Sequence, residues 1–174
     1  HDHRPQALCV SCVRRLEEAL ALYRGEFLAG FSYPSDLYEG WMVVEREALH
    51  AQALEALALL ADGYAARGQH EDAVRAARRQ VELEPWREVA HRQWMRALAL
   101  SGHRGAALAQ FDACRAILAS ELGVEPEAET LALVEQIRDG VFAAPHHAPY
   151  ADRTSSQPLS LTPIVDVSAP PDTY

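Results

Sequence analysis

Apolar residues recur at steps of three and four along most of this 174-residue chain, the spacing that gathers them on one face of an α-helix. Six helices are predicted in this way between residues of about 11 and 141. The first has Cys12, Leu16, Leu20 and Tyr23 on its apolar face and ends near Gly25. The spacing of apolar residues thus predicts a helical chain.

The second predicted helix is the longest. Ser35 or Asp36 caps its start, and Gly68 follows its last turn, where a left-handed C-cap favours glycine. Its early apolar face consists of Leu37, Trp41, Val44 and Ala48, and its later face of Leu49, Ala53, Leu57, Leu60 and Tyr64.

Four shorter helices are predicted after it. The third covers about 71–83 and is stopped by Pro85, and the fourth begins near Arg87 and ends at Gly102. The fifth ends at Gly123, and the sixth starts after Pro126. The sixth is expected to bury Leu131, Val134, Ile137 and Val141.

An internal repeat relates two of the turns, because Gly68 and Gly102 lie 34 positions apart. A period of 34 residues in helix–turn–helix units is the tetratricopeptide spacing. We therefore predict an all-α fold, a tetratricopeptide-like right-handed stack of helical hairpins with about six to seven helices. The same offset relates Ala73 to Ala107, Val74 to Leu108, Tyr64 to Leu98, Leu60 to Trp94 and Ala77 to Phe111.

The domain organisation follows from this pattern. Residues 1–12 are expected to be an N-terminal linker, 13–141 the helical domain, and 142–174 a Pro/Ser-rich linker or disordered tail. The chain starts at His1 without a methionine or a signal-like segment, so we expect a piece of a longer polypeptide. The tail prolines are Pro145, Pro149, Pro158, Pro163, Pro170 and Pro171.

Charge narrows the range of partners. The formal net charge is −9, which disfavours contact with nucleic-acid phosphates or anionic membranes. All 16 basic residues are arginine, so chemistry that needs a lysine, such as a Walker-type phosphate loop, is excluded. No apolar run reaches the roughly 18 residues of a membrane span. Three cysteines are too few for a disulfide scaffold, so we expect the reducing cytoplasm.

Several strings resemble one known family, the bacterial transcriptional activator domain. Residues 22–31, LYRGEFLAGF, look like its opening motif, and 41–46 look like the acidic helix before its repeats. Residues 84–92 and 97–102 resemble its central hairpin. Residues 121–126, ELGVEP, with Glu129 resemble its closing motif and are the most specific string. The resemblance covers roughly 13–140.

The resemblance implies a regulatory role without catalysis or a cofactor. In this family the domain follows a separate winged-helix domain that binds DNA, and large modular regulators continue into further modules. The implied partners are proteins: a second copy, RNA polymerase or adjacent domains of the parent regulator, with no membrane contact. The alternative from the repeats alone is a generic tetratricopeptide scaffold that binds peptides and has no link to transcription.

A binding groove is predicted where the first helix of each hairpin lines the concave side of the stack. Trp86 and Arg87 are candidate interface residues because aromatic residues and arginines dominate binding hot spots, although Trp86 fits the core equally well. His91, beside Arg92, fits hinge packing as well as partner contact. The groove residues are Glu55, Ala58, Asp62 and Ala65 in the first repeat and Val89, Arg92, Arg96 and Ala99 in the second.

Cys9 and Cys12 are the weak candidates for metal or redox chemistry. A CxxC pair supplies half of a tetrahedral zinc site, and His1, His3, His146 or His147 would have to complete it. The pair also fits a redox couple at a helix start, or simple packing of Cys12 in the first helix. No other catalytic or metal-binding constellation is present, so the zinc or thiol protein is the third hypothesis.

Overall fold

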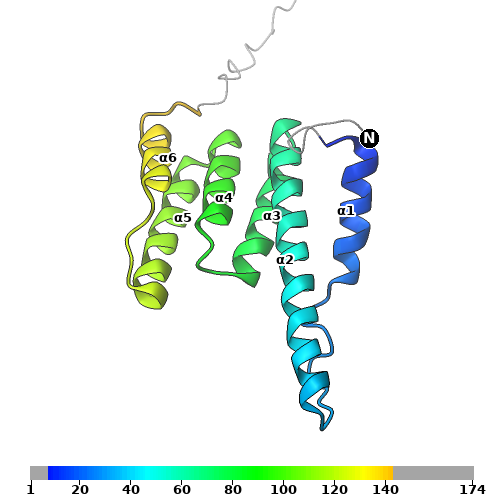
Figure 1. Cartoon of the computed structure of the whole chain (residues 1–174). Helices are drawn as coiled ribbons and strands as arrows, with labels where there is room; N and C mark the ends of the chain where they lie inside the picture. The colour runs from blue at the N-terminus through cyan, green and yellow to red at the C-terminus, as the bar shows by residue number, and fades with distance from the viewer. Residues whose placement is uncertain (1–7, 143–174) are drawn as a thin grey trace, which may run out of the picture.

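The computed structural model describes residues 8–142, which form an all-α stack of helical hairpins without any strand (Figure 1). The predicted fold class is confirmed. Segments 1–7 and 143–174 lie outside the described residues, and with them most of the expected linker and tail. The elements are α1 (Val10–Leu22), α2 (Asp36–Ala66), α3 (His70–Leu83), α4 (Glu88–Leu100), α5 (Arg104–Ile117), the π-helical η2 (Leu118–Leu122) and α6 (Ala128–Arg138).

The predicted repeat is visible in the backbone of the two hairpin turns. Gly68 and Gly102 have φ values of +73° and +80°, so both occupy the left-handed region that glycine tolerates. The amide of Gln69 donates to the carbonyl of Tyr64 at 2.9 Å, and that of His103 donates to Leu98 at 2.9 Å. These are matching helix-ending motifs 34 residues apart, and each reverses the chain into the second helix of a hairpin.

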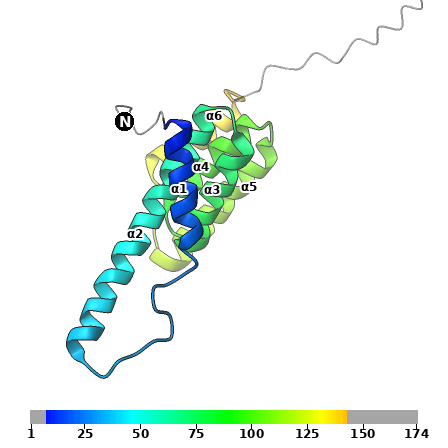
Figure 2. The ribbon, with the colours of Figure 1, turned by 90° about the vertical axis from the view of Figure 1, so that its right-hand side faces the viewer.

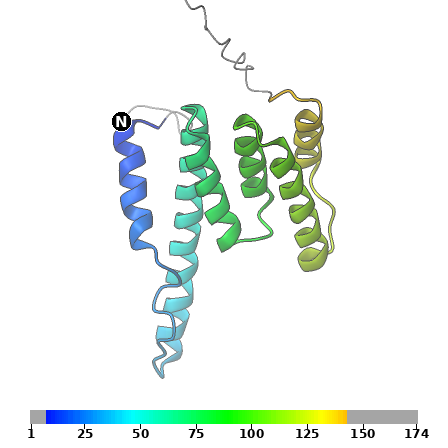
Figure 3. The ribbon, with the colours of Figure 1, turned by 180° about the vertical axis from the view of Figure 1, so that it is seen from behind.

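Small residues let the helices of each hairpin approach closely. Ala73 on α3 and Ala107 on α5 are both buried, as the repeat predicts. The first apolar cluster joins α1, α2, α3 and part of α4, and the second joins α4, α5 and α6. The helices therefore form one row from α1 to α6, seen from behind in Figure 3.

The second helix extends well past the stack. It has 31 residues, whereas α4 and α5 have 13 and 14, so it is about 46 Å long against about 20 Å. Its N-terminal half and the preceding loop project together as an arm, residues 24–51 (Figure 2). Met42 is fully buried between them, so the arm has a small core of its own.

Two predicted apolar faces differ from the structure. On α6, Val134 and Ile137 are buried as predicted, but Leu133 is buried in place of Leu131, which is 46% exposed, and Val141 is also exposed. The run from Leu131 to Val134 is apolar enough for either leucine to be buried, and contact of α6 with α4 and α5 selects Leu133. On α2 every residue of the early face is exposed, and Leu37 is 89% exposed. The reason is that within residues 8–142 the arm has no neighbouring helix on that side.

The last helix closes the stack. Gly140 has φ +76°, and the amide of Val141 donates to Gln136 at 3.1 Å, so α6 ends with the same turn as α2 and α4. Its outer face differs from that of α4, because the polar Gln136 is exposed at the position where α4 carries the partly buried Leu98, counted from the turn glycine. A polar outer face of this kind is what a capping helix requires.

Candidate functional site

The predicted groove lies along α2 and α4, the first helices of the two hairpins. Glu55 and Asp62 on α2 and Arg96 on α4 are all exposed. Asp62 is also part of the packing, since its carboxylate accepts a hydrogen bond from the amide of Gln93 at 2.9 Å. Gln93 in turn accepts from the buried Gln80 on α3 at 2.8 Å. Three helices are thus held in register by a polar chain beneath the groove.

His91 lies in the core, with no exposed surface. Its Nε2 is 2.7 Å from the carbonyl of Pro85, which can only accept, so Nε2 carries the proton. Nδ1 then accepts from the side-chain amide of Gln110 at 2.7 Å. Burial lowers the pKa of His91 and favours this neutral form. This corrects the expectation that His91 faces a partner; it fastens the turn before α4 to α5.

Arg92 also turns inward, and its side chain is only 12% exposed. Its Nη1 donates to Glu127 at 2.8 Å and to the hydroxyl of Thr130 at 3.0 Å, and its Nη2 is 3.3 Å from Glu129. The guanidinium therefore joins α4 to the start of α6. This corrects its placement in an open groove: the capping helix occupies the space that a ligand would need.

Glu88 completes the same cluster, which we call the clasp: Glu88, Arg92, Glu127, Glu129 and Thr130. The Glu88 carboxylate accepts from the Thr130 hydroxyl at 2.6 Å and from the Glu127 amide at 3.0 Å. It therefore caps the N-terminus of α6 from a different helix, where a negative charge is favourable. Glu129 of the closing motif and the adjacent Glu127 thus have a role in holding α6.

Trp86 and Arg87 lie in the turn between α3 and α4. Trp86 is 47% exposed and lines a pocket of about 430 Å³ at the base of the arm, together with Glu47 and His50. Arg87 is 3.6 Å from Glu84 and is partly exposed. Of the predicted residues in this turn, Trp86 presents the larger open surface.

The same pocket contains a Tyr–His–Glu chain. The Tyr23 hydroxyl lies 3.1 Å from Nδ1 of His50, and Nε2 of His50 lies 3.2 Å from Glu84. Because a carboxylate only accepts, His50 donates to Glu84 and accepts from Tyr23. Burial raises the pKa of Tyr23, so the phenol stays protonated and is not an activated nucleophile. The chain ties the end of α1 to α2 and α3.

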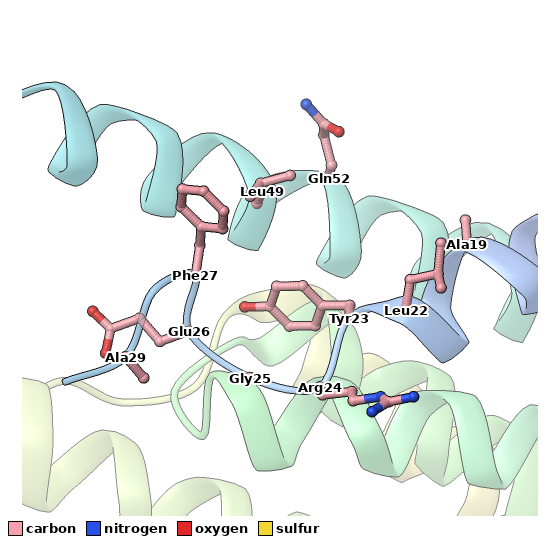
Figure 4. A pocket seen from close by; sticks show the side chains of 10 residues that line it. All are labelled: Ala19, Leu22, Tyr23, Arg24, Gly25, Glu26, Phe27, Ala29, Leu49 and Gln52. Carbon is pink, nitrogen blue, oxygen red and sulfur yellow. The ribbon is translucent and has the colours of Figure 1, made fainter. Parts of the chain in front are cut away.

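A second pocket, of about 590 Å³, lies where the chain leaves α1 and crosses α2 (Figure 4). Tyr23 and Phe27 from the connecting chain and Leu49 and Gln52 from α2 are among its lining residues, and the Phe27 ring points toward α2. The lining is largely apolar. It belongs to the root of the arm and not to the predicted groove, and periodicity alone gave no signal for it.

Cys9 and Cys12 come together at the start of α1. Cys9 is the N-cap residue, and its side chain is within hydrogen-bonding reach of Cys12. Burial, together with this neighbour, raises the pKa of the Cys12 thiol, which favours the thiol over the thiolate that metals and disulfide exchange need. Among residues 8–142 no group of three metal-binding side chains occurs. His1, His3, His146 and His147 lie outside the described residues.

The arm is the feature that helical spacing does not locate, because Leu37, Trp41 and Val44 form an apolar face like that of a packed helix. All three are exposed in the structure. Helix length is the signal that identifies them: α4 begins at Glu88, so the first repeat begins 34 residues earlier, near Leu54, and a hairpin helix needs only about 13 residues. The excess at the start of α2 has no place in the stack.

These observations define a class, a tetratricopeptide-like helical-repeat domain whose polar clusters hold the stack together. Within residues 8–142 no helix has the length and apolarity to cross a bilayer. The model of one family, the bacterial transcriptional activator domain, matches residues 6–138. The chain belongs to this family, and its role is therefore in the regulation of transcription. A comparison with curated proteins finds no match. The family match favours a role in transcription over a generic scaffold.

Proposed function

We propose that this domain is an interaction module of a cytoplasmic bacterial transcriptional regulator, which binds protein and leaves DNA contact to a separate domain. The partner is a second copy, RNA polymerase or a neighbouring domain of the same regulator. Glu55, Asp62 and Arg96 are the proposed groove contacts, with Trp86 and Arg87 at its end. Family membership supports the regulatory role.

The observation that carries the absence of DNA contact is where the arginines point. Arg46 donates to the carbonyls of Phe27 and Leu28, and Arg79 donates to those of Leu20 and Tyr23. Arg92 is held in the clasp. These three of the 16 arginines are used inside the fold, so they are not free to contact phosphates, and the net charge of −9 disfavours such contact further.

The test measures binding of the 174-residue chain to duplex promoter DNA and to purified RNA polymerase across a salt series. We expect no salt-dependent DNA binding, and binding to polymerase or self-association that Arg96→Glu weakens. Arg138→Glu, at the far end of the stack, is the matched control. Tight DNA binding that weakens steeply with salt would contradict the proposal.

A further inference from the structure

The arm exposes an apolar stripe on α2. Leu37, Val44 and Ala51 are seven residues apart, so they lie on one face two turns from each other, with Gly40 and Ala48 between them. Leu37 is 89% exposed and Val44 is 64% exposed. Within residues 8–142 nothing covers this stripe. From Leu37 to Ala51 it is about 21 Å long, which matches about four turns of a second helix.

The opposite side of the arm is firmly braced. Arg46 donates to the Phe27 carbonyl at 2.8 Å and to that of Leu28 at 3.0 Å, and Glu39 accepts from the Tyr33 amide at 3.1 Å. Leu28 is held at φ +51°, a conformation that costs a non-glycine residue about 1 kcal/mol or more. The loop thus fixes α2 from one side and leaves the stripe on the other.

Aromatic rings add to this brace. Tyr38 packs against Phe31, Tyr33 and Trp41 at centroid distances of 6.0, 5.4 and 5.5 Å, and Phe27 packs edge-on against Trp41 at 6.2 Å. Contacts of this kind stabilise beyond the area they bury. The stripe is therefore presented on a preorganised helix, which lowers the entropic cost of docking.

The edges of the stripe are acidic. Asp36 and Glu47 lie along one edge, Glu45 along the other, and the exposed Glu55 at the base of the arm. The basic residue of this stretch of helix, Arg46, is turned back to the loop and lies 3.3 Å from Glu26. Two copies of the arm would bring acidic edges together, whereas a helix with basic edges would meet complementary charge.

We propose that the arm is a docking surface for a basic amphipathic helix of a partner protein. The partner's apolar residues cover the stripe, and its arginines or lysines meet the acidic edges. At the base of the arm the docked helix reaches the pocket lined by Glu47 and Trp86. This inference rests on the proposed function and names one partner chemistry and the surface that binds it.

The probe is a synthetic helical peptide of about four turns with leucine along one face and arginine on both edges. Its binding to the 174-residue chain is measured by calorimetry, and NMR amide shifts locate the site. We expect shifts in 36–51 and at Trp86. Replacing the edge arginines with glutamate is expected to weaken binding at least about tenfold. Equal binding by the acid-edged peptide would overturn the proposal.

The exposed stripe residues allow variants that spare the core. Leu37→Gln with Val44→Gln should raise Kd at least about tenfold, and Glu45→Gln with Glu47→Gln should raise it about threefold and flatten its salt dependence. Leu131→Gln, at an exposed apolar residue on α6, is the control and should leave Kd unchanged. Equal effects of the stripe and control variants would refute the assignment.

Light scattering and a reporter assay separate this inference from the proposed function. If the chain dimerises and Leu37→Gln with Val44→Gln makes it monomeric, the occupant is a second copy and the basic helix is refuted. If deleting the domain abolishes activation by a regulator that contains it while the stripe variant stays active, the arm proposal falls alone. If neither deletion nor variant alters activation, both proposals fall. Loss of activation with the stripe variant but not with Leu131→Gln supports both proposals.

Discussion

Replacing Glu88 with glutamine measures how strongly the clasp holds the capping helix. The Glu88 side chain is only 11% exposed, and it accepts from a buried hydroxyl, that of Thr130, and from the Glu127 amide. Glutamine keeps one acceptor oxygen and places an amide donor where the second was. Both bonds reach Oε2, so the glutamine oxygen can keep them, but the charge that assists them is lost and an amide donor replaces Oε1, 3.2 Å from the Glu127 amide, which also donates. We therefore expect a loss of about 2 kcal/mol.

The matched control is Glu129→Gln, which changes the same charge beside the same arginine. Glu129 lies 3.3 Å from Arg92, but its side chain is 78% exposed, so solvent screens the pair. We expect less than about 0.5 kcal/mol from this change. Because an end helix of a repeat stack can detach alone, the assay is native-state hydrogen exchange of the α6 amides, supported by urea unfolding. Equal effects of the two substitutions, or faster exchange limited to α2, would refute this account of the clasp.

Three further substitutions test the turns and the core. Burial lowers the pKa of His91 below its unfolded value of about 6.5. The free energy of unfolding should therefore be full above about pH 6.5 and fall as the pH drops below it. His91→Gln should flatten this pH dependence, measured by urea unfolding at several pH values. Ala107→Leu should cost about 1–3 kcal/mol in thermal unfolding through overpacking, whereas Ala106→Leu on the exposed face should cost little. Gly102→Ala should cost about 1 kcal/mol through its left-handed backbone, whereas Gly105→Ala within α5 should stabilise by about 0.5 kcal/mol.

Each of these has a contradicting result. A pH slope unchanged in His91→Gln would show that another group titrates. A tolerated Ala107→Leu would mean that α4 and α5 do not cross closely at that residue. A Gly102→Ala variant as stable as the parent would mean that the turn relaxes to a negative φ.

The sequence predicted the stack because the repeat depends on local properties. Turn glycines, small crossing residues and the proline after α3 each act at their own position. The structure has the glycines and the small residues at the 34-residue offset. On α6, Val134 and Ile137 are buried as predicted, but Leu131 is not, because Leu131 and Leu133 are equally apolar and only the geometry of α4 and α5 distinguishes them.

The roles of polar residues were harder to predict. His91 and Arg92 occupy positions on α4 that face the next helix, but helical spacing does not say whether a neighbour is a ligand or the chain itself. Likewise Leu37, Trp41 and Val44 have the spacing of a buried face, and the absence of a helix beside them is a fact of tertiary structure. Glu55, Asp62 and Arg96 remain predicted contacts.

The continuity of α2 has a mechanical consequence. One unbroken run of backbone hydrogen bonds joins the arm tip to the first hairpin, so the helix moves as a lever whose fulcrum is the hairpin packing. A rotation of about 10° at that fulcrum displaces the tip, about 22 Å away, by about 4 Å. Conversely, a load at the tip acts as torque on α3, to which the later helices are joined in series.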